Sequence, residues 1–559
     1  MRKWTMLLVA VSSAAWCQFR PGVNQRMLDR VSPELREMLE AGIEGDDTPM
    51  DVIVKFREQG VTSRKTVVWG NRNGSRLVAA LDLIDSGVYR VTRAQLADLA
   101  VDPEVEWISP DHEVSARMDR TKKAVQADYK WGLGPWGGDG VTVAVIDSGL
   151  IDNEAFQSVL SRVVASKSFV PGDTSTVDAY GHGTHVTSII GGDGYGLDIL
   201  GATYVGMAPG VSLINLRVLD KDGSGKDSAV IQALQWVVAN KNLYRIRVVN
   251  LSLGRPVFQS YKTDPLCQAV EAAWKAGVVV VVAAGNEGRN NSGSVGGYGT
   301  IGAPGNDPYV ITVGAAKTGS TDSRADDIPT TYSSRGPTAI DHVAKPDLIA
   351  PGNRVVALGT GKLKTTYPGN VVNSGGYMQL SGTSMAAPVV SGAVALLLWD
   401  DPWLTPDQVK IKLMKNSWRG MAQSGSVTEN GKTYTFKSDL FTVGAGYLDV
   451  NKALNDYSSV VYTAKLATSP TVAYDSTTKK VKVVTGSGVI WGDAALPIND
   501  VWGSGVVWGD GVVWGDGVVW GDAALTGFSK IWGTSAVIGG GNTGALSSEI
   551  NEVLAKGEQ

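Results

Sequence analysis

The chain has 559 residues; 43% of them are hydrophobic, 19% are charged, and the formal net charge at pH 7 is −4. Such a composition is typical of folded protein and excludes a chain that is disordered throughout. The length indicates two to four domains, and the near-neutral charge provides no basic patch of the kind that binds nucleic acid.

The first 17 residues have the pattern of an export signal. Arg2 and Lys3 precede a short apolar run at residues 4–11, and small residues at 12–15 suit a cleavage site. This run is too short to span a bilayer and no later run of about 20 apolar residues occurs, so we expect a secreted, extracellular protein without a membrane span. A disordered N-terminus or a membrane anchor is the alternative. Cys17 is also a candidate for lipid attachment, although residues 14–16 match a lipoprotein signal poorly.

Cysteine usage limits how the chain is held together. Only two cysteines occur, and loss of Cys17 with or near the signal leaves Cys267 alone. No internal disulfide can then form, so stability must come from a large buried core.

Residues 51–116 predict a small α+β unit. Residues 51–56 alternate like a strand, and residues 88–91 and 105–108 are further strand candidates. Thr92 and Gln95 fit a capping box that opens a helix through Leu99. The preceding segment, 18–49, gives no recognisable pattern.

Residues from about 120 to 455 alternate apolar runs with helical ones. The apolar runs are 141–146, 248–252 and 278–283, and the helical segments include 227–238 and 265–275. Fully apolar strands suit a parallel sheet that is covered on both faces. The pattern therefore predicts an α/β domain with a doubly wound, mostly parallel sheet.

Three motifs in this domain carry Asp, His and Ser in that order. Asp147 lies in Val145–Gly149, His182 in Gly181–Val186, and Ser384 in Gly382–Pro388, which leads into an apolar helix. Each motif alone is also compatible with an ordinary turn or, for Gly-His-Gly, with a metal loop. Together they resemble the triad motifs of the subtilisin-like serine protease family over residues 120–455.

The resemblance implies a defined chemistry for these residues. Ser384 would be the nucleophile, His182 the general base and then acid, and Asp147 the group that orients the imidazole. His185 has helical spacing from His182 and could form a metal pair with it, but no third ligand accompanies them and the family motif assigns the base to His182. Asn286, in Val282–Gly288, resembles the family's oxyanion-hole residue.

Two short segments resemble the edges that pair with an extended peptide substrate in this family. They contain Gly223, Ser224, Gly225 and Ser252, Leu253, Gly254. Backbone pairing binds a peptide with little dependence on its sequence, and glycines permit the close approach of another backbone. Structural turns are the alternative explanation for these glycines.

The resemblance also implies the domain organisation: a signal peptide at 1–17, a prodomain at 18–118, and a catalytic domain at 119–455. The prodomain would act as an intramolecular inhibitor that is removed by self-cleavage between about residues 113 and 123. Protein or peptide substrates are the expected partners. No cofactor is required for the chemistry, and a structural calcium ion is compatible with the family, with its ligands and any other metal site unknown.

Residues 456–559 differ in composition and contain an internal repeat. Val-Val-Trp-Gly-Asp occurs three times, and Trp502, Trp508, Trp514 and Trp520 are spaced evenly. On one straight strand these rings would share a face; with turns at Asp510–Gly511 and 516–517, each Val-Val-Trp would be a short rung. Binding to a surface or to carbohydrate is one interpretation, and a low-complexity extension is the other.

Two other functions remain open from the sequence. A transamidase on the same fold would resolve the acyl-enzyme with an amine in place of water. A surface-binding protein with an inactive protease domain is the second, although the complete triad and Asn286 argue against it.

Overall fold

The computed structural model describes residues 49–483 with internal gaps, and a few residues on either side. The described residues outside that range are 30–32, 35–36, 39, 506–507, 513–514 and 557–558; the gaps within it are 59–62, 73, 82–85, 111–116, 128–136, 152–155, 157–160, 195–203, 290–295, 320, 322, 373–375, 430, 459–460, 462–466 and 476–479. The chain divides into two compact units, Met1–Val114 and Ser115–Gln559, and each is described by itself.

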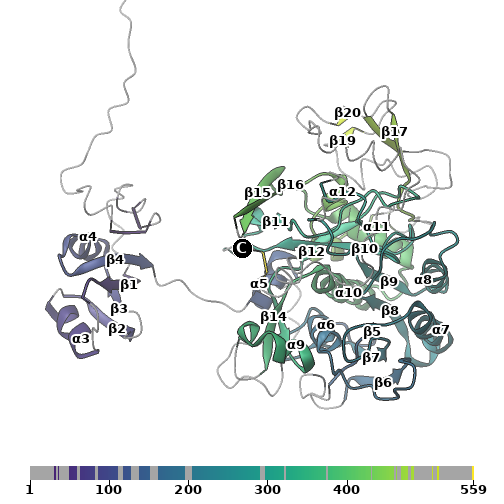
Figure 1. Cartoon of the computed structure of the whole chain (residues 1–559), viewed down its shortest axis with the longest axis horizontal. Coiled ribbons are helices and arrows are strands. Elements are labelled where there is room, and N and C mark those ends of the chain that lie inside the picture. Colours follow the sequence, from purple (N-terminus) through teal and green to yellow (C-terminus); the bar gives the residue numbers. More distant parts are fainter. Residues whose placement is uncertain are drawn as a thin grey trace, which may run out of the picture. The chain divides into compact units, whose positions relative to one another are not determined.

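The N-terminal unit contains a four-stranded antiparallel sheet with helices packed on it (Figure 1). Its strand order is β2-β3-β1-β4. The elements are β1 (Met50–Phe56), α3 (Ser63–Arg72), β2 (Arg76–Leu81), β3 (Ser86–Val91), α4 (Arg93–Val101) and β4 (Val105–Pro110). The sequence predicts β1, β3, β4 and α4 but neither α3 nor β2. The predicted capping box opens α4, with reciprocal hydrogen bonds between Thr92 and Gln95.

The core of this unit also includes residues upstream of the predicted folded part. Val31 and Leu35 are fully buried, and Val31 forms a β-bridge with Ile108. The same core holds three aromatic rings packed edge to face, those of Phe56, Trp69 and Tyr89. The folded part therefore begins before residue 51. Sequence reasoning missed this although Val31, Leu35 and Leu39 are spaced four residues apart, which is compatible with one face of a helix.

The second unit is built on an eight-stranded, mostly parallel sheet. Strand order is β11-β10-β9-β8-β5-β7-β6, with β12 paired beside β10. The strands are β5 (Thr142–Asp147), β6 (Val163–Ser168), β7 (Ser212–Arg217), β8 (Ile246–Leu251), β9 (Val279–Ala283), β10 (Ile311–Lys317), β11 (Ile328–Pro329) and β12 (Leu348–Pro351). Only β11 runs antiparallel to its neighbour. Parallel strands end at the same edge, so the residues that follow β5, β8 and β9 lie at one rim of the sheet.

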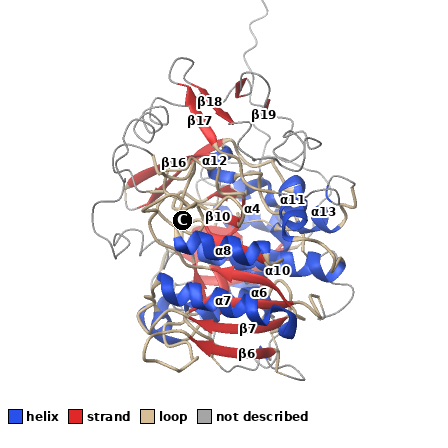
Figure 2. Ribbon diagram, turned by 90° about the vertical axis from the view of Figure 1, so that its right-hand side faces the viewer, coloured by secondary structure: helices blue, strands red, loops and turns tan. Residues whose placement is uncertain are grey.

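Helices cover both faces of this sheet, as predicted for a doubly wound α/β domain. Figure 1 shows α6 (His182–Gly191) and α10 (Thr383–Asp400) on one side, with α7 (Asp227–Tyr244) and α8 (Pro265–Lys275) on the other. Figure 2 shows α7 and α8 lying across the strands. The bounds of α8 match the predicted segment, and α7 continues beyond the predicted end at residue 238.

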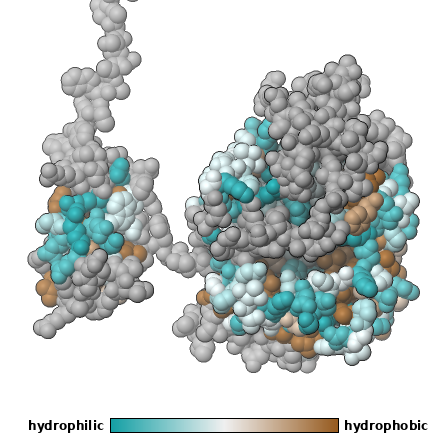
Figure 3. Space-filling model, in the orientation of Figure 1, coloured by the Kyte–Doolittle hydropathy of each residue, from teal (hydrophilic) through white to brown (hydrophobic). Residues whose placement is uncertain are grey.

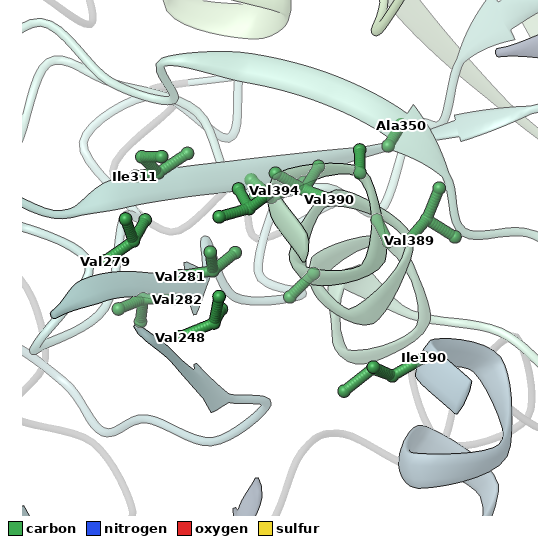
Figure 4. Close-up of a cluster of buried hydrophobic side chains, with 14 of the residues drawn as sticks. Ile190, Val248, Val279, Val281, Val282, Ile311, Ala350, Val389, Val390 and Val394 are labelled. Carbon is green, nitrogen blue, oxygen red and sulfur yellow. The ribbon is translucent and has the colours of Figure 1, made fainter. Parts of the chain in front are cut away.

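Helix α10 is almost entirely buried in the core of the domain. Every residue from 381 to 398 is buried except Ser384. Its valines, with Val389, Val390 and Val394 among them, pack against strands β8, β9 and β10 (Figure 4). Among the described residues α10 is long and apolar enough to cross a membrane, but most of it is buried inside the unit, as in a core helix.

Packing of the second unit continues past the predicted domain boundary at residue 455. Val461, Ala467 and Val472 are buried in the same core as the sheet. Ser469 is held by a buried charge cluster, since its Oγ donates to Asp347 Oδ1 at 2.5 Å and accepts from Lys410 Nζ at 2.9 Å. These residues are therefore part of the second unit and not of a separate tail.

Most of the tryptophan repeat lies outside the described residues. Within it, β19 (Val506–Val507) and β20 (Val513–Trp514) pair antiparallel, with Val506 opposite Trp514. This is the pairing expected when the chain reverses at Asp510–Gly511, and it disagrees with one straight strand through both copies. The binding role suggested for the repeat is not addressed by this pairing.

Burial along α10 predicts a strong dependence of stability on its apolar side chains. Leu397 is fully buried, so Leu397→Ala should lower the free energy of unfolding by about 2–5 kcal/mol. Leu243 is 73% exposed, and Leu243→Ala should change this free energy by less than about 0.5 kcal/mol. On the face of the second unit that Figure 3 shows, hydrophobic and hydrophilic surface residues are interspersed. Denaturant unfolding followed by circular dichroism compares the two variants; equal losses would contradict the packing described here.

Candidate active site

The three motifs meet at the carboxyl rim of the central strands. Asp147 is the last residue of β5, His182 is the first residue of α6, and Ser384 lies in the first turn of α10. Helices α6 and α10 pack against each other beside β5. His182 and Ser384 lie in the first turns of these helices. Both remain partly exposed, while the helix residues next to them are buried. The two side chains best placed to react are thus accessible, on rigid supports.

Asp147 and His182 form a close pair. His182 Nδ1 lies 2.8 Å from Asp147 Oδ1, which also accepts the backbone N–H of Ser148 at 2.7 Å. Burial lowers the pKa of His182, but the charge and hydrogen bond of Asp147, together with the charge of Asp178, raise that pKa above its ordinary value of 6.5. Because Nδ1 faces the carboxylate, Nε2 lies on the opposite side of the imidazole ring. There it can exchange a proton with another group.

Asp178 holds the first turn of α6, although no sequence motif identified it. Gly181, at the N-cap, has no side chain to satisfy the helix's free N–H groups. Asp178 accepts the N–H groups of Gly181 and Thr184, both at 2.7 Å, and Ser148 Oγ accepts that of Gly183 at 2.8 Å. The position of His182 is therefore fixed by carboxylate capping from outside the helix.

The glycines on either side of His182 are required by backbone packing. Gly181 has φ +108°, and a Cβ there would lie 2.2 Å from Thr360 O. A Cβ at Gly183 would lie 2.4 Å from Gly149 O. Glycine at both positions therefore lets the chain pass closely against the backbone at Thr360 and Gly149 on either side of His182.

His185 belongs to the core and not to a metal pair with His182. It is fully buried, and its Nε2 lies 3.1 Å from the carbonyl oxygen of Met378. Burial is the main cause that lowers its pKa, to about 3, so the imidazole is neutral. Among the described residues, no group of three or more His, Cys, Asp or Glu side chains could hold a metal ion.

Ser384 is hydrogen bonded to the end of β8. Its Oγ donates to Ser252 O at 3.2 Å, and no hydrogen bond between Ser384 and His182 occurs among the described side chains. Hydrogen bonds of catalytic groups are often long or misaligned without substrate and tighten when it binds. Because Ser384 lies in the first turn of α10, its backbone N–H has no partner within the helix and is free to donate to a ligand.

Pro388 explains a second bond between β8 and the turn that carries Ser384. A proline inside a helix cannot donate to the carbonyl four residues earlier, which here is that of Ser384. Ser252 Oγ donates to this carbonyl instead, at 2.8 Å. Asn250 Nδ2 donates to Ser252 Oγ at 2.9 Å, and Ser391 Oγ donates to Asn250 Oδ1 at 2.8 Å. A buried polar chain thus replaces the missing helix bond.

Asn286 follows β9 and is fixed by the residue before Ser384. Its Oδ1 accepts the backbone N–H of Thr383 at 2.9 Å and the Thr383 hydroxyl at 3.1 Å. Thr383 Oγ1 in turn accepts the N–H of Gly285 at 3.1 Å. These bonds use only the oxygen of the amide, which leaves the Nδ2 donor of Asn286 available beside the start of α10.

The two predicted substrate edges contain glycines that pack against the protein's own backbone. Gly223 has φ +77° in a turn held by Asp220, whose Oδ1 accepts the Ser224 N–H at 3.0 Å. A Cβ at Gly225 would lie 2.7 Å from Val218 O, and one at Gly254 would lie 2.9 Å from Ala303 O. The turn explanation therefore accounts for these glycines. Leu253 follows Ser252, whose hydroxyl is already engaged with Ser384.

Comparison with known proteins gives a consistent result. The sequence matches the model of the Subtilase family over residues 138–484. "Serine protease AprX" of Bacillus subtilis (strain 168) is 33% identical over 382 residues, which cover 66% of this chain and 82% of that protein. "Subtilisin DY" of Bacillus licheniformis is 35% identical over 308 residues, covering 55% and 91%. A solved structure of "a cold adapted subtilisin-like serine proteinase" is 31% identical and covers 56% of this chain and 90% of that chain, with a TM-score of 0.39.

The Ser252 bridge predicts a specific coupling with Pro388. Ser252→Ala leaves the buried Ser384 carbonyl without its donor and should lower the free energy of unfolding by about 1–3 kcal/mol. Pro388→Ala restores an N–H at the helix position that normally serves this carbonyl. The double variant should therefore be less destabilised than the sum of the two single variants, as measured by thermal unfolding. Strict additivity would show that the bridge does not substitute for the helix bond.

Proposed function

Since this chain belongs to the subtilase family and is a serine endopeptidase, we propose that Asp147, His182 and Ser384 are its catalytic triad. The observation that carries this assignment is the 2.8 Å contact between His182 and Asp147 at the rim where α10 presents Ser384. A secreted enzyme made as a self-processed precursor is the form in which we expect this activity.

The reaction follows from what each group can donate or accept. Ser384 Oγ attacks the carbonyl carbon of the scissile bond while His182 Nε2 takes its proton. The C–N bond then breaks as the imidazolium returns that proton to the leaving amine, which gives an acyl-enzyme. Water repeats both steps and releases the acid. Asp147 stabilises the imidazolium and keeps Nδ1–H directed to itself.

Asn286 would supply the side-chain donor of the oxyanion hole. Its Oδ1 is held by Thr383, so its Nδ2 cannot exchange places with the oxygen without losing two hydrogen bonds. The free backbone N–H of Ser384 would be the second donor. Both donors are fixed before substrate arrives, which is the arrangement that stabilises developing negative charge most effectively.

Protein or peptide substrates would bind across the rim between the two segments around Gly223–Gly225 and Ser252–Gly254. Each segment is anchored by hydrogen bonds within the protein, so its remaining backbone groups are preorganised to pair with an extended peptide. Pairing of this kind does not depend on the side chains of the substrate. Backbone pairing would therefore determine the affinity for a peptide, and other loops would determine which substrate side chains are accepted.

The N-terminal unit would be the prodomain and intramolecular inhibitor. It is a compact unit that ends at Val114, next to the predicted cleavage region at 113–123. A signal peptide at residues 1–17 would direct secretion, and the tryptophan repeat would mediate any attachment to a surface or to carbohydrate.

Self-processing tests the nucleophile directly. We expect the purified wild-type protein to lose its N-terminal residues up to a bond between about 113 and 123, and Ser384→Ala to retain them, because cleavage requires the Ser384 hydroxyl. Intact-mass spectrometry gives the result. If both proteins stay full length, the prodomain assignment fails; if both are cut alike, another protease acts, and hydrolysis of a peptide substrate becomes the deciding assay.

Loss of the Asn286 amide should reduce turnover without preventing binding. Removing one oxyanion-hole donor lowers kcat by about 10²–10³-fold, a range that comes from subtilisin itself, and we expect Asn286→Ala to fall within it with little change in KM. Steady-state kinetics on a peptide substrate measure both constants. A change confined to KM would assign Asn286 to substrate binding instead.

The raised pKa of His182 predicts the acid limb of the pH profile. Protonated imidazole cannot accept the Ser384 proton, so kcat/KM should fall tenfold per pH unit below the His182 pKa and level off above it. Because Asp147 and Asp178 raise that pKa, the midpoint should lie above 6.5. The pH dependence of kcat/KM measures it, and a midpoint below 6.5 would contradict the assignment.

A further inference from the structure

The last residues that the structure describes lie inside the second unit. Gly557 and Glu558 are buried, and Glu558 is completely inaccessible to solvent. The residues around them come from three separate loops; we call this group, Arg289, Thr331, Asn353 and Arg354, the C-terminal socket. A charged residue near a chain end is normally exposed, so its burial requires a specific set of partners.

The backbone of Glu558 is bound by one asparagine. Asn353 Nδ2 donates to Glu558 O at 2.9 Å, and Glu558 N donates to Asn353 Oδ1 at 2.7 Å. Gly557 has φ +76°, and a Cβ there would lie 2.2 Å from Arg354 Cγ. The socket therefore fits a glycine followed by a residue with a free N–H and C=O.

The side chain of Glu558 is bound by three donors. Its Oε2 accepts the Thr331 N–H at 2.7 Å, the Thr331 hydroxyl at 2.6 Å and Arg289 NH2 at 3.1 Å. Arg289 also pairs with Glu429 at 2.7 Å and stacks over the ring of Tyr434. Arg289 is thus held in place independently of Glu558, as in a preformed carboxylate-binding site.

The socket connects directly to the two segments that carry Asn286 and Ser384. The stretch after Thr331 lies against residues 285–288: Gly288 N donates to Tyr332 O at 2.8 Å, and Ser334 N donates to Gly285 O at 2.9 Å. A Cβ at Gly288 would lie 2.0 Å from Ser333 O, so the two backbone segments are packed too closely to leave room for any side chain at position 288.

The other wall of the socket reaches the nucleophile turn. Gly382, the N-cap of α10, donates its N–H to Gly352 O at 2.8 Å, and Arg354 N donates to Ser381 Oγ at 2.9 Å. Asn353 lies between these two bonds. Glu558 therefore bridges one loop that positions Asn286 and another that positions Ser384.

We propose that the C-terminal socket is a binding site for an acidic peptide segment, that its resident ligand is the chain's own Gly557–Glu558, and that seating this ligand positions the oxyanion-hole and nucleophile segments. Glu558 is then a positioning residue, since it acts through the loops at 331–334 and 352–354. The effect on catalysis rests on the roles proposed above for Asn286 and Ser384; the binding itself does not.

Binding is tested apart from activity. A chain that stops after Lys556, carrying Ser384→Ala so that it cannot digest the ligand, is titrated with a peptide of residues 551–559. Titration runs to about millimolar peptide, because attachment to the same chain raises the effective concentration of the segment, which a free peptide has to match. We expect saturable binding by calorimetry, and no binding by the same peptide with Glu558→Gln or with Gly557→Ala. Absence of binding by the unmodified peptide would overturn the proposal.

The positioning role is tested in the active enzyme. The truncated chain with an intact Ser384 should show a kcat at least tenfold lower with KM nearly unchanged, and the peptide should restore kcat. The melting temperature should fall by about 5 °C or more, since the buried Arg289 loses one of its two carboxylate partners. Glu558→Gln in the full chain keeps the backbone contacts with Asn353 and should show a smaller loss of kcat, which covers the case that the truncated chain does not fold.

A matched control variant distinguishes a failure of the socket proposal from a failure of the catalytic assignment. Glu271→Gln removes a carboxylate from a surface pair with Lys275 and should leave kcat and the melting temperature unchanged. If the truncated chain and Glu558→Gln both behave like this control, the socket proposal is wrong. If Ser384→Ala retains full activity, the catalytic assignment is wrong, while peptide binding still decides the socket.

Discussion

Burial of α10 against the parallel sheet is the constraint on which the active site depends. Every residue from 381 to 398 except Ser384 is buried, so neither the axis of α10 nor its first turn can shift without opening the core. Parallel strands bring the ends of β5, β8 and β9 to one rim, and α10 begins at that rim. The exposed hydroxyl of Ser384 is therefore set by apolar packing that extends well away from it.

Helices α6 and α10 begin at this rim, so some of their backbone N–H and C=O groups have no partner within the helix. The residues that hydrogen bond to these groups also fix the positions of the active-site residues. Asp178 and Ser148 take the free N–H groups of α6, and Ser252 takes the carbonyl that Pro388 cannot serve. Thr383 connects the start of α10 to Asn286. An unpaired polar group at any of these places would cost about 1–3 kcal/mol, so capping and positioning are enforced by the same bonds.

Local patterns in the sequence predict the parts of the structure that depend on neighbouring residues. The apolar strands, α8 and the capping box of α4 follow from period and caps, and Asp147 and His182 lie together as their motifs indicate. Contacts between distant residues were missed: Val31 against Ile108, Asp178 at the start of α6, and Ser469 in the core beyond residue 455. Each is a single polar or apolar residue whose partner is known only once the chain is folded. Pro388, four residues after Ser384, is the one clue to the Ser252 bridge that the sequence contains.

Buried charges in the core of the second unit bind two segments from the C-terminal part of the chain, those that contain Ser469 and Glu558. Asp347 pairs with Lys345 at 2.7 Å and Lys410 at 3.2 Å and receives Ser469, while Arg289 receives Glu558. Desolvation offsets most of the attraction in such pairs, so they add little stability compared with apolar residues of the same size. A misplaced segment would nevertheless leave a buried charge unpaired, which costs far more than the pair contributes. We infer that these clusters act mainly by excluding alternative placements of the C-terminal residues, so that the loops behind Asn286 and Ser384 have one arrangement.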